Sequence, residues 1–413
     1  MTTLPEIRTH SSYSQLAVGS HDAVVAVYTG ADILTQQQAP YTDWEAAAAP
    51  FLVLVPAPSV GGGRLVLSPI DSVDDDTDDV RKVFDAVKSG VARAIEAGAR
   101  RPAVYLAPLP ASVNAVPDAD YSRWIEVALL AALEASYVTL VVREHRTATL
   151  GADAVVENLH SIDLVVESHS DEELRSAVKR ATAIEGGRRL ALDMGYGDPE
   201  RMTPYKCAET IQAAAASVPG LEFEVIKDLD MIKQDYPLLY HSARASFAEK
   251  RTWPCVVKLE YRSPVPAQVK EHLFLVGKGV TYDTGGISLK IGGSMRGMSR
   301  DKLGACGVAG FAVATGLMQE TAVDLSCVLA FERNSIGPNS LLPDEIVYSR
   351  AGVRVLINDT DAEGRLVMTD PVAECRERIL AARVAGSKIP AAIYTVATLT
   401  GHVIRAYGWY GAT

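Results

Sequence analysis

The sequence predicts an α/β protein of two domains, and three observations support this fold class. First, at 413 residues the chain is long enough for two or three domains, each with its own core. Second, short apolar runs of strand length alternate with segments of helical periodicity. Third, a segment of helical character at 171–194 ends in the glycine- and proline-containing sequence GYGDPERMTP, which separates two such series.

The first domain is predicted to span residues 1–170. The expected strands are AVVAVYTG, FLVLVPA, PAVYLAP, YVTLVV and IDLVVES, beginning at residues 23, 51, 102, 137 and 162. A helix is expected between the third and fourth strands, and another over residues 80–95, where apolar residues recur at helical spacing. The acidic run at 71–79 precedes this second helix, and its charge is favourable at the positive end of the helix dipole.

Residues 171–198 are predicted to form a connecting helix and a linker, and residues 199–413 a second α/β domain. Thr203 is expected to cap a helix that begins at Pro204. Further helices are expected after residues 301 and 365. The strands expected here are LEFEVIK, CVVKLEY, HLFLVGK, VDLSCVLAF, VRVLIN and AAIYTV, beginning at residues 221, 255, 272, 323, 353 and 391.

The composition excludes several classes of protein. The formal net charge is -11 and there is no basic stripe, so we expect no nucleic-acid surface. No apolar run approaches the roughly 18 residues that span a bilayer, and the start, MTTLPEIRTHSSYS, lacks the regions of a signal peptide. We therefore expect a cytoplasmic protein without membrane contact. The five cysteines are odd in number and form no CxxC pair, which predicts reduced thiols, several of them in the core.

Polar residues cluster in two segments where an apolar strand ends. The first, LFLVGKGVTYDTGGISLK, is interpreted as a strand that runs into a glycine-rich turn carrying Lys278, Asp283 and Lys290, with Asp301 eleven residues later. The second, VRVLINDTDAEGRLVMTD, is interpreted as another strand, followed by polar residues just before a helix. These residues are Asp359, Asp361, Glu363 and Arg365. In parallel sheets such strand ends form the crevice where ligands bind.

Carboxylates gathered in one such crevice would need a cation. In an extended segment Asp361 and Glu363 can point to the same side, because they are two residues apart. With Asp283 and Asp301 in the same crevice, repulsion and desolvation would be prohibitive without countercharge. Carboxylate ligands without histidine or cysteine suit Mg, Mn or, less typically, Zn. The chain has no HExxH motif, which excludes a thermolysin-like site.

The stretch VGKGVTYDTGGISLK, followed by DTDAEGRL, resembles the signature pair of the leucyl aminopeptidase family, the dinuclear metallo-aminopeptidases of peptidase family M17. The YDTGG variant is closest to the branch of probable aminopeptidases, and TPYKCAE and ATLTG extend the resemblance over 176–413. The resemblance implies a smaller macro-domain-like first domain and a C-terminal catalytic domain with a central mixed sheet flanked by helices. Compared with the family, the catalytic domain is expected to be shortened at its C-terminal end.

The same resemblance implies a metal-dependent exopeptidase that releases N-terminal residues, with a leucine-type preference, from short peptides. Two divalent cations, Zn²⁺ and/or Mn²⁺, would activate a water. Lys290 would stabilise the oxyanion, and Arg365 would help to hold a bicarbonate that carries the proton. A homo-oligomer, a hexamer in the family, is also expected. Asp283 and Glu363 would bridge the metals, Lys278 and Asp301 would complete one site and Asp361 the other, and substrate would contact Met298, Thr398, Leu399 and Gly401.

Two alternatives stay open. One is a catalytically impaired family member that acts as a structural or binding subunit, because Leu303 stands where the family usually has glycine and the C-terminal end is expected to be short. The other is a nucleotide-like ligand in the first domain, for which the glycine cluster GGGRL at 61 is the motif.

Overall fold

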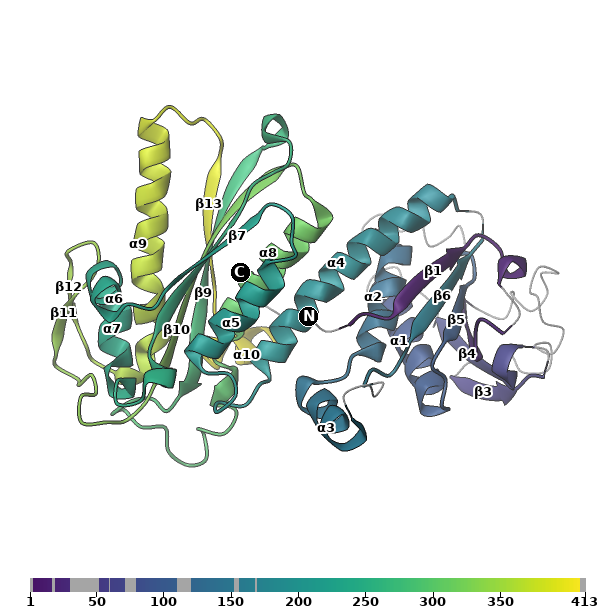
Figure 1. Cartoon of the computed structure of the whole chain (residues 1–413), viewed down its shortest axis with the longest axis horizontal. Helices are drawn as coiled ribbons and strands as arrows, with labels where there is room; N and C mark the ends of the chain where they lie inside the picture. The colour runs from purple at the N-terminus through teal and green to yellow at the C-terminus, as the bar shows by residue number, and fades with distance from the viewer. Residues whose placement is uncertain are drawn as a thin grey trace. The chain divides into compact units, whose positions relative to one another are not determined.

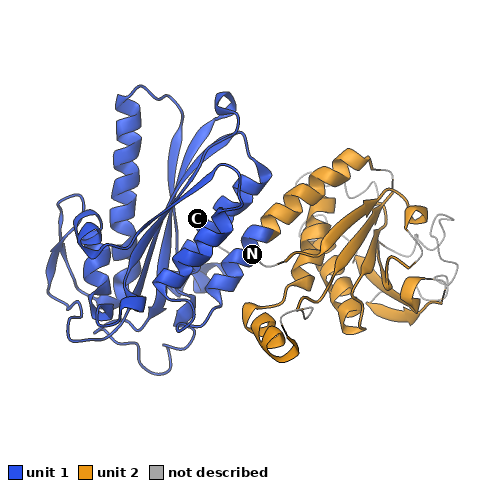
Figure 2. Ribbon diagram, in the orientation of Figure 1, with its two compact units in different colours: residues 1, 186–413 blue, residues 2–185 orange. Residues whose placement is uncertain are grey.

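A computed structural model of the chain describes residues 3–16, 19–29, 52–58, 60–70, 79–109, 120–151, 156–167 and 169–408. The predicted α/β class is confirmed: both parts of the chain combine strands and helices (Figure 1). The chain divides into two compact units, residues 2–185 and residues 186–413, here called the amino-terminal and carboxyl-terminal units (Figure 2). The division falls within one long helix, α4 (Asp171–Gly195), in the segment expected to connect the two domains.

The amino-terminal unit contains a six-stranded sheet in the order β1-β6-β5-β2-β4-β3. All neighbouring strands are parallel except β3, which runs antiparallel to β4 at one edge. The strands are β1 (Glu6–His10), β2 (Ala23–Thr29), β3 (Val53–Pro56), β4 (Arg64–Ile70), β5 (Pro102–Leu106) and β6 (Ser161–Val166). Its other helices are α1 (Arg81–Glu96), α2 (Trp124–Ser136) and α3 (Leu140–Leu150).

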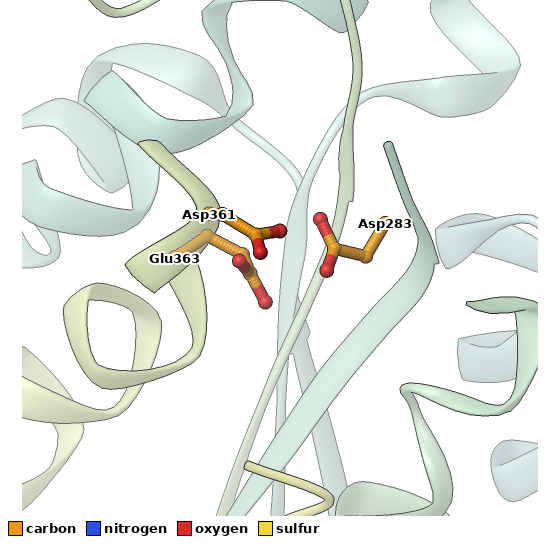
Figure 3. Close-up of side chains that lie close together, drawn as sticks. All are labelled: Asp283, Asp361 and Glu363. Atoms are coloured by element: carbon orange, nitrogen blue, oxygen red, sulfur yellow. The ribbon is translucent and has the colours of Figure 1, made fainter. Parts of the chain in front are cut away.

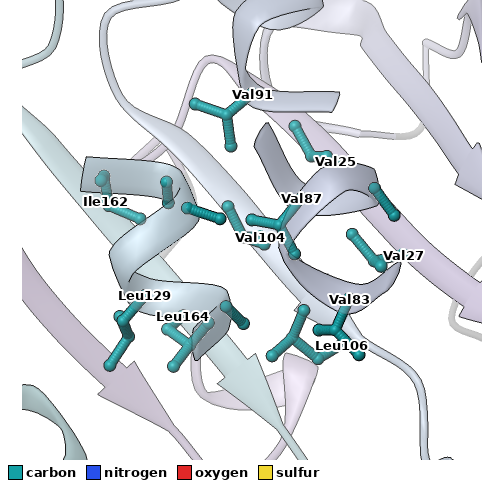
Figure 4. Packing of buried hydrophobic residues seen from close by; sticks show 14 of the residues in the cluster. Val25, Val27, Val83, Val87, Val91, Val104, Leu106, Leu129, Ile162 and Leu164 are labelled. Carbon is teal, nitrogen blue, oxygen red and sulfur yellow. The ribbon is translucent and has the colours of Figure 1, made fainter. Parts of the chain in front are cut away.

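The core of this unit follows from strand alternation. Val25 and Val27 of β2 point to one face, where they pack with Val87 of α1 (Figure 4). Val24 and Ala26 point to the other face and join a second buried cluster. Because successive strand residues alternate sides, an apolar run such as AVVAVYT implies a strand covered on both faces. The helical stripe predicted at 80–95 is confirmed by α1.

Three features of this unit differ from the prediction or were missed. The predicted strand YVTLVV is wrong: its second half begins the helix α3, where Val141 and Val142 are 49% and 41% exposed. The β-branched run favours a strand locally, but the position of the segment in the tertiary structure overrides that preference. The short strand β1 was missed, and so was β4. β4 contains Pro69, and proline is unusual in a strand that pairs on both sides. The acidic run at 71–78 lies outside the described residues.

The glycine cluster at 61–63 has a packing explanation. A Cβ at Gly62, where φ is 70°, would lie 1.9 Å from the carbonyl oxygen of Asp22. A Cβ at Gly61 would lie 2.6 Å from the imidazole of His21. Side chains at these two positions would therefore collide with the segment before β2, and this close approach explains Gly61 and Gly62 without a nucleotide-like ligand.

The carboxyl-terminal unit contains a five-stranded mixed sheet in the order β13-β9-β10-β8-β7. β13, β9 and β10 are parallel, and β8 and β7 are antiparallel to their neighbours. The strands are β7 (Leu221–Ile226), β8 (Cys255–Tyr261), β9 (Glu271–Asp283), β10 (Val323–Asn334) and β13 (Ala391–Val396). The helices after α4 are α5 (Pro204–Ala215), α6 (Leu229–Asp235), α7 (Pro237–Ala243), α8 (Leu303–Met318), α9 (Glu363–Val384) and α10 (His402–Tyr407).

Helices cover both faces of this sheet. Val276 of β9 packs in a buried cluster with side chains of α7 and α9, whereas a Cβ at Gly277, the next residue, would lie 2.5 Å from the backbone of Ala305 in α8. Thr203 caps α5 as predicted, since its hydroxyl accepts a hydrogen bond from the backbone N–H of Lys206. The strand predicted at 353–358 exists as β12 (Arg354–Leu356), but β12 pairs only with β11 (Ile346–Tyr348), in a separate two-stranded sheet.

The five cysteines are all buried and unpaired, which confirms the expected free thiols. Within the described part of the chain, no single helix has both the length and the apolar content to cross a membrane. The bent pair α2 and α3 meets both criteria only when taken together.

Candidate metal centre

Lys278 and Asp283 both lie on β9. The strand extends to Asp283, beyond the predicted end of HLFLVGK at Lys278, so Lys278 lies inside the strand, where it is 2% exposed, and Asp283 lies at its end and not in the turn. Gly279 lets β9 stay close to β10 beyond Lys278, because a Cβ at this position would lie 2.5 Å from the carbonyl oxygen of Ala330 on β10. The turn after β9 begins with Gly285, whose φ of 86° requires glycine, and it returns Lys290 to the end of the strand.

Asp361 and Glu363 were predicted to lie in an extended segment, but they do not. Asp361 lies in a 3₁₀ turn (Thr360–Ala362), and Glu363 is the first residue of α9. Asp359 caps this turn by accepting a hydrogen bond of 2.9 Å from the N–H of Asp361. Each carboxylate still reaches Asp283: oxygen atoms of Asp283, Asp361 and Glu363 lie within 4.8 Å of one another (Figure 3). The tight turn brings together side chains that an extended segment was expected to align.

Two lysines neutralise part of this acidic cluster. Nζ of Lys278 lies 2.7 Å from Oδ2 of Asp301 and 2.8 Å from Oε1 of Glu363. Nζ of Lys290 lies 2.8 Å from Oδ2 of Asp283 and also contacts Oδ1 of Asp361. The structure therefore brings together all five predicted metal ligands and Lys290. Four carboxylates against two ammonium groups leave the site with surplus negative charge.

The pKa directions have this same origin. Burial raises the pKa of Glu363 above its ordinary value, and neighbouring carboxylates add to the effect against the influence of Lys278. Burial likewise raises the pKa of Asp301. For Lys278, burial by itself lowers the pKa, but the Glu363 and Asp301 carboxylates outweigh it, so the net pKa is raised. The two acids hold their protons more tightly mainly because the site is buried, whereas the amine does so because the surrounding carboxylates are negative.

The residues present fit a divalent cation. Oε2 of Glu363 is buried and has no hydrogen-bond partner in the described part of the chain, so an acceptor of the cluster is unsatisfied. Carboxylate oxygens are the ligands that hard divalent cations prefer. Lys278 could serve as a ligand only as the neutral amine, so cation binding there would release its proton.

One of the four predicted substrate residues is shown in contact with this cluster. Thr398 is part of it: its hydroxyl donates to Oδ1 of Asp301 at 2.7 Å, and its carbonyl accepts from Nζ of Lys278 at 3.3 Å. Leu399 follows and is 46% exposed, and Gly401 is the N-cap of α10. Met298 is half-buried in the 3₁₀ turn just before Asp301.

Two further residues of interest lie close by in sequence. Arg365 is exposed on the first turn of α9, and its guanidinium makes no ion pair with any residue that the structure describes. Leu303 begins α8, and its Cδ2 faces Gly195 at the end of α4, where a Cβ would approach it to 2.3 Å. Its side chain therefore packs against the end of α4.

Three residues of the site were missed from the sequence. Asn334, at the end of β10, donates hydrogen bonds to Oδ1 of Asp283 at 2.8 Å and to the carbonyl of Thr360 at 3.1 Å. Glu332 is fully buried near Asp283 and Glu363, and its Oε1 accepts from Ser242 at 2.8 Å. The polar sequence ERN at the end of the apolar run VDLSCVLAF is the signal that could have identified these two. The third is Gly364, where a Cβ would lie 2.7 Å from Nζ of Lys278.

The fold and the site together define an α/β protein with a carboxylate centre suited to divalent cations. The centre lies at the carboxyl ends of two inner strands of a mixed sheet. The model of the cytosol aminopeptidase family, catalytic domain, matches residues 189–413. The chain is also 37% identical over 361 residues to "Putative aminopeptidase W07G4.4" of Caenorhabditis elegans, covering 87% of this chain and 64% of that protein. The chain therefore belongs to the cytosol aminopeptidase family, peptidase family M17, which confirms the resemblance.

Solved structures share the fold. Leucyl aminopeptidase from Trypanosoma brucei in complex with bestatin superposes with a TM-score of 0.74 at 23% identity, over 98% of this chain and 75% of that one. The bottromycin maturation enzyme BotP in complex with Mn gives a TM-score of 0.68 at 21% identity, over 94% of this chain and 74% of that one. The chain thus spans less than two thirds of the length of the curated relative and about three quarters of these structures.

Proposed function

We propose that this protein is a metal-dependent aminopeptidase that releases the N-terminal residue from short peptides. The observation that carries this proposal is the convergence of Asp283, Asp361 and Glu363, with carboxylate oxygens within 4.8 Å, beside the ion-paired Lys278 and Asp301. Membership of the cytosol aminopeptidase family and the manganese in the related BotP structure support a divalent cation, Mn²⁺ or Zn²⁺, at these residues. Bound there, two such cations would acidify a water and polarise the scissile carbonyl.

The other residues act on the peptide. Lys290 reaches Asp283 and Asp361 with a side chain that is 15% exposed, so its ammonium can also face a bound peptide. It would stabilise the negative charge that develops on the carbonyl oxygen. Arg365 is exposed, and in the described structure it has no ion-pair partner, so its guanidinium is available to hold a bicarbonate that takes up the proton. Thr398 and Leu399 would contact the substrate backbone.

The finer assignments form part of the same proposal. Met298 and Gly401 would line the pocket for the first side chain, with a leucine-type preference. The protein would work in the cytoplasm, as a homo-oligomer and by family resemblance a hexamer, on peptides and without nucleic acid or membrane partners.

The test measures metal content and activity on one preparation. Purified protein loaded with Mn²⁺ or Zn²⁺ should contain the cation by elemental analysis and should release the chromophore from leucine p-nitroanilide. Asp361→Ala should abolish turnover because it removes a ligand from the exposed side of the cluster. The matched control is Asp359→Asn, two residues away, because asparagine keeps the cap on the N–H of Asp361; this variant should stay active.

Folded, metal-loaded protein that is inert on a broad panel of N-terminal amides would overturn the enzymatic proposal. It would favour the alternative of a structural or binding subunit. Protein that takes up no cation would overturn the metal centre itself.

A further inference from the structure

We propose that Lys302 is a positioning residue that holds the carboxylate of Asp301 in place for cation binding. This role rests on the proposed metal centre, in which Asp301 is a ligand. Lys302 follows Asp301 directly and is the N-cap residue of α8. It contacts none of the carboxylates of the cluster at ion-pair distance among the described residues, so any influence on the site passes through Asp301.

The ammonium of Lys302 is buried in an unusual way. The residue is 0% exposed, yet among the residues that the structure describes its Nζ donates only to main-chain carbonyls, at 3.2 Å to Gly197 and at a shorter distance to Ser299. Burying an ammonium group without a carboxylate partner is costly, and an apolar side chain of similar length could fill the same space. What the lysine adds is therefore the pair of hydrogen bonds.

These hydrogen bonds join the turn that precedes Asp301 to the turn that follows α4. Ser299 belongs to the 3₁₀ turn (Met298–Arg300) that leads into Asp301, and Gly197 belongs to the turn that follows α4. The same two segments meet a second time, because the guanidinium of Arg300 lies 5.0 Å from the centre of the Tyr196 ring. The backbone on both sides of Asp301 is thus tied to the end of α4.

The position of the Asp301 carboxylate follows its main chain, because its side chain has one hydrogen bond, at Oδ1, and Oδ2 has an ion pair but no hydrogen bond in the described structure. Oδ1 accepts from the hydroxyl of Thr398, and Oδ2 pairs with Lys278. A small shift of the main chain would move the carboxylate relative to Asp283 and Glu363, which belong to other elements. Such residues behind a ligand typically change metal affinity by roughly 10- to 100-fold.

The test titrates MnCl₂ alone into metal-free full-length protein by calorimetry and, separately, unfolds the metal-free protein in urea. Lys302→Met removes the donors and keeps the length. Lys258→Met is the matched control, since Lys258 is a partly buried lysine of β8 whose ion pair is with Glu374, outside the cluster. We expect both variants to be less stable, but only Lys302→Met to lose Mn²⁺ affinity, by roughly tenfold or more.

Arg300→Gln serves as a second variant, because Arg300 is exposed and its replacement leaves the fold intact. It should weaken Mn²⁺ binding by roughly two- to fivefold. Wild-type affinity in both Lys302→Met and Arg300→Gln would overturn the positioning role while leaving the metal centre standing. If Lys302→Met does not fold, the Arg300→Gln titration decides alone. Unsubstituted protein that binds no Mn²⁺ would overturn the metal centre, and this role with it.

Discussion

Asn334 of β10 lies directly opposite Asp283 of β9 in the parallel register, and its side-chain amide donates a 2.8 Å hydrogen bond to the Asp283 carboxylate. The same amide also donates to the carbonyl of Thr360, one residue before Asp361. A single buried side chain therefore connects the strand end that carries Asp283 with the turn that carries Asp361.

Asn334→Leu should weaken divalent-cation binding, because Asp283 loses the donor that orients it and the 3₁₀ turn loses its link to the sheet. We expect roughly 10- to 100-fold lower affinity in a Mn²⁺ titration. Thr281→Val is the control: it removes one buried hydrogen bond, to the carbonyl of Glu332, from the same strand pair without touching a carboxylate of the cluster. Equal losses of Mn²⁺ affinity in the two variants would contradict this role.

Gly364→Ala should disturb the site from the side of α9. A Cβ at this position would lie 2.7 Å from both Nζ and Cε of Lys278, whose ammonium is already fixed by Asp301 and Glu363. The lysine would have to move, so we expect lower metal affinity and a loss of about 1–3 kcal/mol in the free energy of unfolding. Urea unfolding and Mn²⁺ titration measure the two effects.

The control for this substitution is Gly307→Ala on α8, where no atom lies within 4 Å of the added Cβ. That change should be neutral or stabilise the protein by up to about 1 kcal/mol, because alanine is the better helix former. A Gly364→Ala variant that behaves like Gly307→Ala would show that Lys278 moves aside without cost.

Glu345→Gln should reduce stability in a pH-dependent way. Burial by itself would raise the pKa of Glu345, but hydrogen bonds from Arg244 and from the N–H of Leu342, with the charge of Arg244, outweigh it, so the pKa lies below the ordinary 4.5. The folded state then binds fewer protons than the unfolded state. The contribution of Glu345 to the free energy of unfolding is therefore complete above pH 4.5, and it disappears as the pH falls through the lowered pKa of the folded state.

We expect a loss of about 1 kcal/mol at pH 7 from Glu345→Gln, and a smaller difference from the parent protein as the pH falls below 4.5. Urea unfolding at several pH values measures both. Exposed Glu224 of β7 gives a control, because Glu224→Gln should change the free energy of unfolding by less than about 0.5 kcal/mol at pH 7. A difference for Glu345→Gln that stays constant down to pH 3 would contradict the prediction.

Local pattern predicted much of the fold. The continuous apolar run AVVAVYT and the helical stripe with Val83, Val87 and Val91 each formed the expected element, because burial of both faces of a strand or of one helical stripe follows from the residue pattern. The strand predicted at YVTLVV was wrong because the position of the segment in the tertiary structure overrides the local strand preference of its β-branched residues. β12 formed as expected but joined a different sheet, since pairing partners are not encoded in the strand itself.

By itself the sequence determined the α/β class, the free cysteines and the kinds of side chain available for a cation: Lys278, Asp283, Asp301, Asp361 and Glu363. Only the tertiary structure decided how they meet. Lys278 contacts Glu363 because β9 and the first turn of α9 pack together, and Asn334 reaches Asp283 because β10 is the parallel neighbour of β9. Periodicity describes one element at a time, whereas a site depends on the order and packing of elements distant in the chain.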